Sequence, residues 1–292
     1  TPMILNILIN LLNICLNFLF IYPSRELTLF GHECSVWGAG WGVGGAAFAS
    51  GLSTAVVFLL FVLVLFRKRS PIRISLKERF SFERTCLSAV WRLGLPVALE
   101  RATVSVAQLI ITAVITGIGT TAVAANHLAV TAESISYLPA YGVAVAATTL
   151  VGQAVGAGRK DLAKRFARLV TWIGILVMTF GGLLLFCLAP QLIRIFTSES
   201  EVVALGTQVL RIVAFAEPLF GASIVASGAL RGDGDSKGPF FISLATMWGV
   251  RITLSFLLAG SLGLNGVWLA MAAELCVRGL IFMVRLYRGR WL

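Results

Sequence analysis

The stretch MILNILINLLNICLNFLFIY, residues 3–22, is long and apolar enough to cross a lipid bilayer as a helix. It also contains four asparagines, Asn6, Asn10, Asn13 and Asn17, which follow one another at spacings of four, three and four residues. With about 3.6 residues per helical turn, these amides fall within an arc of about 60° on one face. The stretch therefore combines a membrane span with a continuous polar stripe.

The rest of the chain repeats the apolar pattern. Hydrophobic residues make up 58% of the 292 residues and charged residues only 13%, and the mean hydropathy is +0.91. A soluble domain of this length needs far more polar surface. Runs long enough to span a bilayer lie at residues 3–22, 42–66, 94–117, 121–154, 166–189, 201–229, 238–260 and 264–285. Since backbone polar groups must be satisfied inside hydrocarbon, we predict an all-α polytopic transmembrane bundle of eight spans, bent at Pro139 and Gly142 in the fourth.

The net charge of +11 is distributed as a topology signal. Lys and Arg crowd the connections 67–92 and 155–168, are present in the connection 230–237, and recur in the C-terminal tail. Arg25 and Arg194 are the only basic residues in the intervening connections. Because basic loops stay on the cytoplasmic side, we expect a multi-pass protein of the inner or plasma membrane with a cytoplasmic C-terminus. The basic excess therefore does not indicate a nucleic-acid partner.

Motifs typical of enzymes and metal sites are missing from the sequence. The five cysteines form no CxxC pair, and neither histidine lies in a catalytic or zinc-binding pattern. The segment VGQAVGAG, residues 151–158, lacks the lysine of a phosphate-binding loop and is better explained as a helix end. We therefore expect no enzyme activity, no metal site and no cofactor.

A weak internal repeat suggests the domain organisation. GVGGAAFA (42–49) and GLNGVWLA (263–270) share the pattern G-x-x-G-x-x-x-A, and each opens a span after an outside connection. Parallel repeats of this kind are a known transporter architecture. We expect residues 1–66 to be the last two helices of an N-terminal lobe, 67–92 a basic cytoplasmic linker, and 93–292 a six-helix C-terminal lobe. The chain would then lack the N-terminal helices that complete the first lobe.

Ionisable residues inside the spans are costly, at about 2.5–3.5 kcal/mol each, and usually have a function. The acids are Glu100, Glu133, Glu217 and Glu274, and the bases are Arg211, Arg251 and Arg278. Glu274 and Arg278 stand at i, i+4, so we expect a structural ion pair. Glu217 and Arg251 lie at similar depths, which favours a second pair, either a static clamp or a protonation-linked switch.

The remaining polar residues are candidates for coupling transport to an ion. Glu133 has no base at its depth, so it could carry a proton or ligate a cation once hydrated. Glu217 is followed by Pro218, which frees backbone groups at the same depth. Glu100 is the third acidic candidate. For the amide stripe, we favour a polar seam at Asn13 and Asn17 and helix–helix contacts at Asn6 and Asn10.

Several motifs resemble one family along the full length of the chain. They are LGLPVALE (93–100), AANHLAVTAESISYLPAYGVAVAATTLVGQAVGAGRKDLAKR (124–165), LRGDGDS (230–236), and GVWLAM (266–271) with a final GRW (289–291). The chain is similar to the C-terminal two-thirds of a multidrug and toxic compound extrusion (MATE) transporter. The resemblance implies a twelve-helix protein with two six-helix lobes, of which eight spans lie here.

The resemblance also implies site residues. In one branch of the family, helix five carries Asn and, four residues later, Asp; Asn13 and Asn17 match that spacing, with Asn17 in place of the acid. In another branch the acids lie on helices seven and ten, which here carry Glu100 and Glu217, although the family positions fall nearer Ser105 and Phe220. The candidates for the coupling site are therefore the Asn13 and Asn17 pattern, the Glu100 and Glu217 pattern, and Glu133.

The expected function is a cation-coupled antiporter that exports organic cations or drugs by alternating access, with Na⁺ or H⁺ as the coupling ion. Its expected partners are small organic cations and membrane lipids. The alternatives are a lipid-linked oligosaccharide flippase of similar fold, which would need a cationic cleft, and a non-transporting membrane scaffold, which would need no unpaired acids in its spans.

Overall fold

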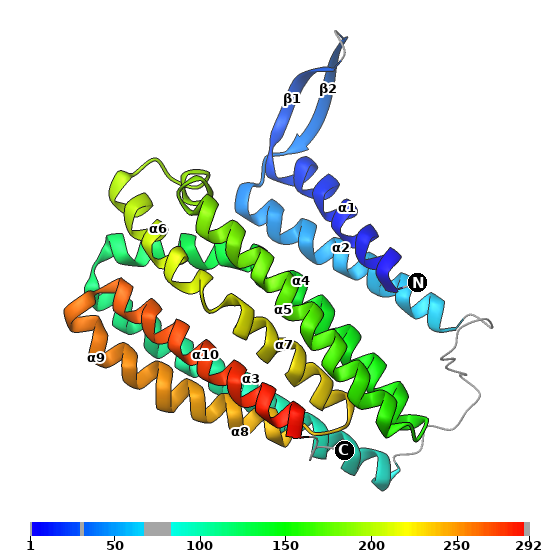
Figure 1. The fold of residues 1–292 in the computed structure, drawn as a ribbon. Helices are drawn as coiled ribbons and strands as arrows, with labels where there is room; N and C mark the ends of the chain where they lie inside the picture. The colour runs from blue at the N-terminus through cyan, green and yellow to red at the C-terminus, as the bar shows by residue number, and fades with distance from the viewer. Residues whose placement is uncertain (1, 30–31, 67–82, 289–292) are drawn as a thin grey trace. The chain divides into compact units, whose positions relative to one another are not determined.

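The computed structural model describes residues 2–29, 32–66 and 83–288 (Figure 1). The chain forms two compact units, unit 1 at residues 1–81 and unit 2 at residues 82–292. Most of the predicted linker 67–92 lies outside the described residues. Its last part is described and is helical from Arg84 onward.

Unit 1 is a helix pair joined by a β-hairpin. Its elements are α1 (Pro2–Ile21), β1 (Pro23–Leu29), β2 (His32–Ala39) and α2 (Gly42–Leu65). The strands pair antiparallel, with Leu29 opposite His32 and an irregularity between Pro23 and Arg25. The sequence analysis assigned no strands to this connection. The hairpin lies outside the apolar runs, so its edge groups are not expected to face hydrocarbon.

The packing of α1 on α2 depends on small residues. Gly45 and Ala49 are buried on α2, and a side chain at Gly45 would overlap the carbonyl oxygen of Phe20 on α1. The ring of Phe20 stacks on Trp41 at 5.5 Å and meets Phe48 edge-on at 5.1 Å. The glycine lets the backbones approach, and the aromatic side chains then fill the space around the contact.

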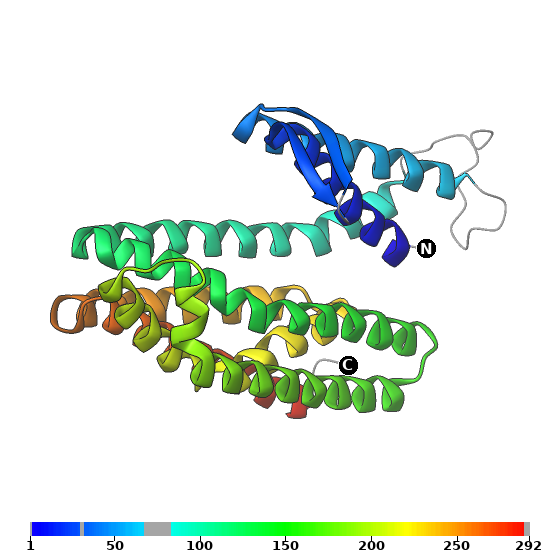
Figure 2. The ribbon, with the colours of Figure 1, turned by 90° about the horizontal axis from the view of Figure 1, so that it is seen from above.

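In its described residues, 83–288, unit 2 consists of helices and their connections, with six candidate spans if the bent pair Ser200–Ala214 and Glu217–Gly232 is one span. Its helices are α3 (Arg84–Ile118), α4 (Thr120–Gly156), α5 (Lys160–Arg194), α6 (Ser200–Ala214), α7 (Glu217–Gly232), α8 (Lys237–Thr246), the π-helix η1 (Met247–Ile252), α9 (Thr253–Leu262) and α10 (Leu264–Arg288). Figure 2 shows α4 and α5 side by side, and both pack on α7. The segments α8, η1 and α9 form one continuous span that packs against α3 and α10.

Seven helices in the described residues are long and apolar enough to cross a membrane, or eight if the bent pair α6–α7 is one span. The predicted all-α polytopic bundle is confirmed, although α3 begins at Arg84 where the predicted span began at residue 94, and α5 begins at Lys160 where it began at residue 166. The fourth span is one helix, Thr120–Gly156, that continues through Pro139. The pronounced bend lies instead between α6 and α7, where the axes differ by 58°.

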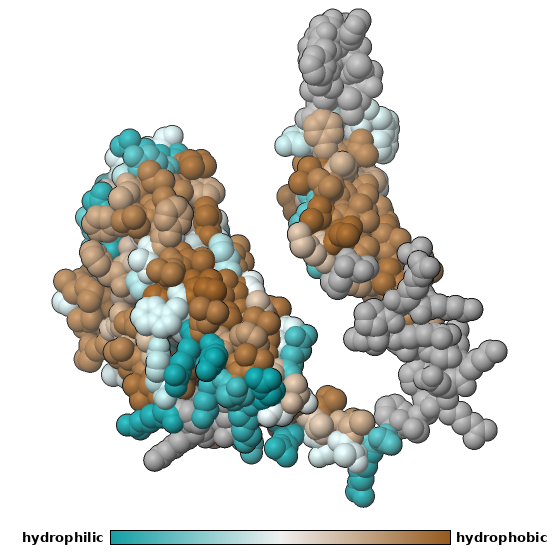
Figure 3. All heavy atoms as spheres, turned by 45° about the vertical axis from the view of Figure 1, so that its right-hand side comes forward, coloured by the Kyte–Doolittle hydropathy of each residue, from teal (hydrophilic) through white to brown (hydrophobic). Residues whose placement is uncertain are grey.

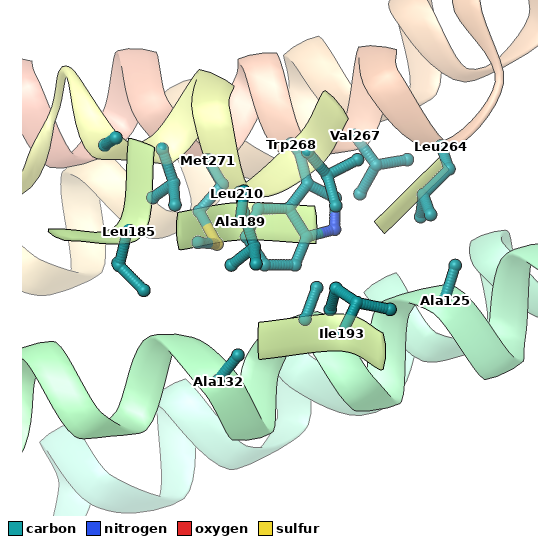
Figure 4. Close-up of a cluster of buried hydrophobic side chains, with 14 of the residues drawn as sticks. Ala125, Ala132, Leu185, Ala189, Ile193, Leu210, Leu264, Val267, Trp268 and Met271 are labelled. Carbon is teal, nitrogen blue, oxygen red and sulfur yellow. The ribbon is translucent and has the colours of Figure 1, made fainter. Parts of the chain in front are cut away.

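The core of unit 2 combines large side chains with a stripe of alanines on α4. Trp268 of α10 is buried against Ile193, Leu210 and their neighbours (Figure 4), and its indole nitrogen donates a hydrogen bond to Asn126 Oδ1 at 3.0 Å. The buried face of α4 includes Ala122, Ala125, Ala129, Ala132, Ala140, Ala144 and Ala147. These small side chains let α5 and α7 approach α4 closely.

The outer surface of the helices is apolar, as a lipid-facing surface must be. Figure 3 shows hydrophobic residues over most of the visible helical surface and hydrophilic residues gathered near the ends of unit 2. Leu109, Val145 and Leu176 are among the exposed large side chains. The protein is therefore a multi-pass membrane protein.

The two copies of the repeated motif make equivalent contacts, each inside its own unit. A side chain at Gly266 of α10 would overlap the carbonyl oxygen of Leu258 on α9, just as one at Gly45 would overlap that of Phe20 on α1. Ala49 and Ala270, four residues after these glycines, are fully buried. In both units the motif lets a helix pack closely on the preceding one.

Candidate functional site

Glu217 lies where the sixth crossing is broken. Helix α6 ends at Ala214 and Glu217 begins α7, so Phe215 and Ala216 form the break. Pro218 follows directly at the start of α7, where a missing backbone N–H is tolerated and the ring prevents the helix from continuing unbroken from α6. The backbone is therefore irregular beside Pro218, where the sequence analysis expected free backbone groups, and the break places a carboxylate at a helix start.

The carboxylate of Glu217 is fully buried and has one protein donor. Ser136 of α4 donates a hydrogen bond from Oγ to Glu217 Oε2 at 2.7 Å, whereas Oε1 is buried without a hydrogen-bond partner. Two adjacent glycines of α5 make room for this contact. A side chain at Gly181 would overlap Ser136 Oγ, and one at Gly182 would lie 2.9 Å from Glu217 Cβ.

Glu133 lies on α4 three residues before Ser136, on the same helical face, and is buried. Two charged groups act on its carboxylate: Glu217 repels the negative charge, and Arg251 attracts it. The guanidinium of Arg251 acts on Glu133 and Glu274, whereas the hydroxyl of Ser136 is the polar group that acts on the carboxylate of Glu217. A proton or a monovalent cation would neutralise the surplus negative charge, which is the chemistry this arrangement favours. We call Glu133, Ser136 and Glu217 the buried carboxylate site.

The predicted ion pair between Glu217 and Arg251 is wrong. Arg251 lies in the segment Met247–Ile252, which packs on α3 and α10, whereas α7 contacts this span through α8, so equal depth did not bring the two side chains together. Arg251 donates instead from Nη2 to the sulfur of Met271 at 2.8 Å, and its Nε is buried without a partner. In this position the charge of Arg251 attracts the carboxylates of Glu274 and Glu133.

Arg251 is carried by a segment that the sequence analysis missed. Residues Met247–Ile252 form a π-helix, an insertion that is frequent at functional sites. The extra residue in this turn changes which side chains face inward. Counting about 3.6 residues per turn from Lys237 therefore does not predict the direction in which Arg251 points. Gly249 within the segment was the only sequence signal of an irregular helix there.

Glu274 and Arg278 form the predicted contact within α10. Arg278 Nε lies 3.3 Å from Glu274 Oε1, and Thr246 donates a hydrogen bond to the same oxygen at 2.9 Å. Glu274 is fully buried, and its Oε2 has no hydrogen-bond partner. The pair joins α8 to α10 through Thr246, a partner that the sequence analysis did not identify.

Glu100 is paired inside unit 2. Its Oε2 accepts a hydrogen bond from Arg231 Nη2 at 2.7 Å, and its Oε1 accepts one from Ser243 Oγ at 3.1 Å. These residues of α3, α7 and α8 line a cavity of about 110 Å³ together with Tyr141 and Arg278. Of the three acidic candidates, Glu100 is the one with a direct ion pair.

The amide stripe lies in unit 1 and makes contacts of two kinds. Asn13 Nδ2 lies 3.1 Å from Ser50 Oγ and 3.3 Å from Ser53 Oγ on α2, and Asn17 Nδ2 donates to Asn13 Oδ1 at 2.9 Å. Asn10 Nδ2 donates to its own helix at the carbonyl oxygen of Asn6. Asn13 thus joins α1 to α2, whereas Asn17 Oδ1 is buried without a hydrogen-bond partner.

No three His, Cys, Asp or Glu side chains gather as possible metal ligands in residues 2–29, 32–66 and 83–288. The interior acids are instead distributed singly or in pairs over α3, α4, α7 and α10.

Comparison with known proteins gives consistent results. The family model MatE matches residues 96–257. The "Probable multidrug resistance protein NorM" of Thermotoga maritima is 29% identical over 300 residues, covering 100% of this chain and 60% of the relative. The "Uncharacterized transporter YisQ" of Bacillus subtilis is 28% identical over 294 residues, covering 99% and 61%.

Solved structures have the same fold. One described as "MATE in the straight conformation" superposes with a TM-score of 0.85 at 25% identity, covering 99% of this chain and 63% of that one. The chain thus spans about three-fifths of the length of the relatives it matches.

Proposed function

Because the chain belongs to the MatE family, a family of transporters and not of enzymes, we propose that the full-length protein is a cation-coupled antiporter. It exports organic cations or drugs by alternating access and uses inward movement of Na⁺ or H⁺ as the driving force. No other cofactor takes part. The protein resides in the cell membrane with its C-terminus in the cytoplasm, in contact with lipids and with small organic cations as substrates.

The observation that supports this function best is the environment of Glu217. A fully buried carboxylate with one hydroxyl donor and one unpartnered oxygen is costly in a membrane interior, and it stands beside a second buried acid, Glu133. Binding a proton or Na⁺ at the buried carboxylate site relieves that cost. A purely structural role would be served better by an apolar pair of the same volume.

The broken helix couples this chemistry to a change of shape. Glu217 begins α7 at the 58° bend, so a change in its charge acts on the residues that connect the two half-helices. An ion can shift an equilibrium between two orientations only if it binds one of them more tightly. In the proposed cycle, the ion favours the orientation in which Glu217 and Glu133 are neutralised, and the substrate favours the other.

The coupling role of the buried carboxylate site is tested by efflux from cells or proteoliposomes. Glu133→Gln and Glu217→Gln keep the side-chain size and remove the charge, so we expect each to lower ion-dependent efflux at least about tenfold. Glu201→Gln on the exposed first turn of α6 is the matched control and should transport normally. Thermal unfolding of each variant verifies that the loss does not reflect misfolding.

Ion-dependent efflux at the wild-type rate in both variants would exclude the buried carboxylate site as the coupling site. Glu100→Gln and Asn17→Ala, measured in the same assay, then distinguish the remaining candidates. We expect a smaller effect on coupling for Glu100, because its charge is already neutralised by Arg231.

A further inference from the structure

A second polar cavity lies where α5 ends and α6 begins. It has a volume of about 710 Å³, and its polar lining includes Arg194, Thr197, Ser198, Thr207, Gln208 and Arg211. None of the residues of the buried carboxylate site lines it. The cavity is therefore separate from that site.

Helix α6 builds one wall of the cavity from a single face. Ser200, Ala204, Thr207 and Arg211 line the cavity at spacings of four, three and four residues, so they stand above one another along the helix. Side chains on a helix lean toward its N-terminus, which here is the end near Ser200. The guanidinium of Arg211 is thus directed toward the same end of the bundle as Arg194, the last residue of α5.

Both arginines are exposed, and neither has an acidic partner. Among the described residues, Arg194 and Arg211 take part in no ion pair, although Glu199 and Glu201 lie nearby in the sequence. The Nε of Arg211 donates a long hydrogen bond of 3.4 Å to the carbonyl oxygen of Phe186, which leaves its other N–H groups available. The walls of the cavity contain two positive charges and no acid.

The cavity also offers hydroxyl donors. Thr197, Ser198 and Ser200 line the wall nearest the α5–α6 connection. Guanidinium and hydroxyl groups around one space are the donors that a phosphate group requires.

Aromatic surface continues from the cavity toward the middle of the span. The guanidinium of Arg211 lies 5.5 Å from the centroid of the Phe186 ring, and this ring meets Phe215 edge-on at 5.5 Å. Phe186 and Phe215 are both exposed. A free inorganic anion gains nothing by contact with this apolar surface, whereas acyl chains bury apolar area against it.

We propose that this cavity binds the phosphate headgroup of an anionic phospholipid. Arg194 and Arg211 would neutralise the phosphate, the hydroxyl groups would donate hydrogen bonds to it, and the acyl chains would run along Phe186 and Phe215. The lipid would fill the space between the end of α5 and the exposed face of α6, and so stabilise the half-helix that leads to the bend.

The proposal is tested with the full-length protein in nanodiscs. Phosphatidylglycerol retained by the protein is counted by native mass spectrometry over a range of mole fractions in phosphatidylcholine. We expect Arg194→Gln and Arg211→Gln each to weaken phosphatidylglycerol binding about fivefold, and the double variant roughly 25-fold. Arg165→Gln, an exposed arginine at the other end of α5, is the matched control and should leave this binding unchanged.

Two further measurements distinguish a bound lipid from a folding defect and from a soluble anion. The variants should unfold at the wild-type temperature in pure phosphatidylcholine, which excludes a general loss of folding. Millimolar inorganic phosphate should not displace the phosphatidylglycerol, because it lacks the acyl chains. Equal lipid binding by wild type and double variant would overturn the proposal, and displacement of the lipid by free phosphate would assign the cavity to a soluble anion instead.

Discussion

At the scale of single residues, the buried acids of unit 2 differ in how their charge is compensated. Glu274 has Arg278 and Thr246, and Glu100 has Arg231 and Ser243. The protein gives Glu217 only a hydroxyl donor. Because removing a charge from water costs several kcal/mol unless a counter-charge replaces it, an acid with a hydroxyl alone is the best candidate for a group that takes up its counter-charge during transport.

If the Glu274–Arg278 pair compensates a buried charge, removing one partner should destabilise the protein more than removing both. Arg278→Gln leaves Glu274 buried without its nearest counter-charge, so we expect a loss of about 3 kcal/mol in the free energy of unfolding. The double variant Glu274→Gln/Arg278→Gln removes both charges and should lose clearly less than the single one. Chemical denaturation in detergent micelles measures both. If the single and the double variant lose the same free energy of unfolding, the unpaired charge of Glu274 does not cause the loss.

At the scale of helices, glycines position the elements that carry the site. Gly182 on α5 allows α5 to approach the bend. Gly174 and Gly221 allow α5 and α7 to pack against each other, since a side chain at Gly174 would overlap Val225 and one at Gly221 would overlap the backbone oxygen of Gly174. Close packing of this kind is the main source of helix association inside a membrane, where lipid is as apolar as the side chains. The position of Glu217 therefore depends on glycines of α5 and α7.

The role of Gly182 is tested by adding one methyl group. Gly182→Ala would place its Cβ 2.7 Å from the carbonyl oxygen of Ala214 and 2.9 Å from Glu217 Cβ, so the helices must move apart. We expect a loss of about 1–3 kcal/mol in the free energy of unfolding, together with weaker transport. Gly142→Ala on α4 is the control, because its Cβ would have no neighbour within 4 Å. If both variants are equally stable, the close contact at Gly182 is not needed.

At the scale of the whole molecule, the polytopic helical fold and the family are established. The predicted resemblance to MATE transporters is confirmed by the family match and by solved structures of the same fold. The orientation in the membrane stays a prediction, which depends on the alternation of basic connections along the chain. It places the α4–α5 connection in the cytoplasm and the α5–α6 connection outside.

Cysteine labelling tests this orientation directly. In a variant without its five native cysteines, Ser198→Cys should react with a membrane-impermeant maleimide added to intact cells. Lys160→Cys should react only after the membrane is made permeable. Both positions are exposed next to helix ends, so they form a matched pair. The reverse pattern of labelling would invert the predicted topology and place the C-terminus outside the cell.

The sequence by itself determined the spans, the fold class, the family and the contact between Glu274 and Arg278. Apolar runs define helices because lipid satisfies no backbone group, and residues at i, i+4 meet on any helix. The sequence placed a bend in the fourth span, at Pro139 and Gly142, whereas the 58° bend of the structure lies between α6 and α7, beside Pro218. Only the tertiary structure decided which distant side chains meet: Ser136 with Glu217, Arg231 with Glu100, and Arg251 with Met271. The depth of a residue in the membrane follows from counting residues along its helix. Contact between two side chains depends on which helices are neighbours and on the π-helical turn that shifts the inward face. The periodicity of the local sequence does not encode either of these two features.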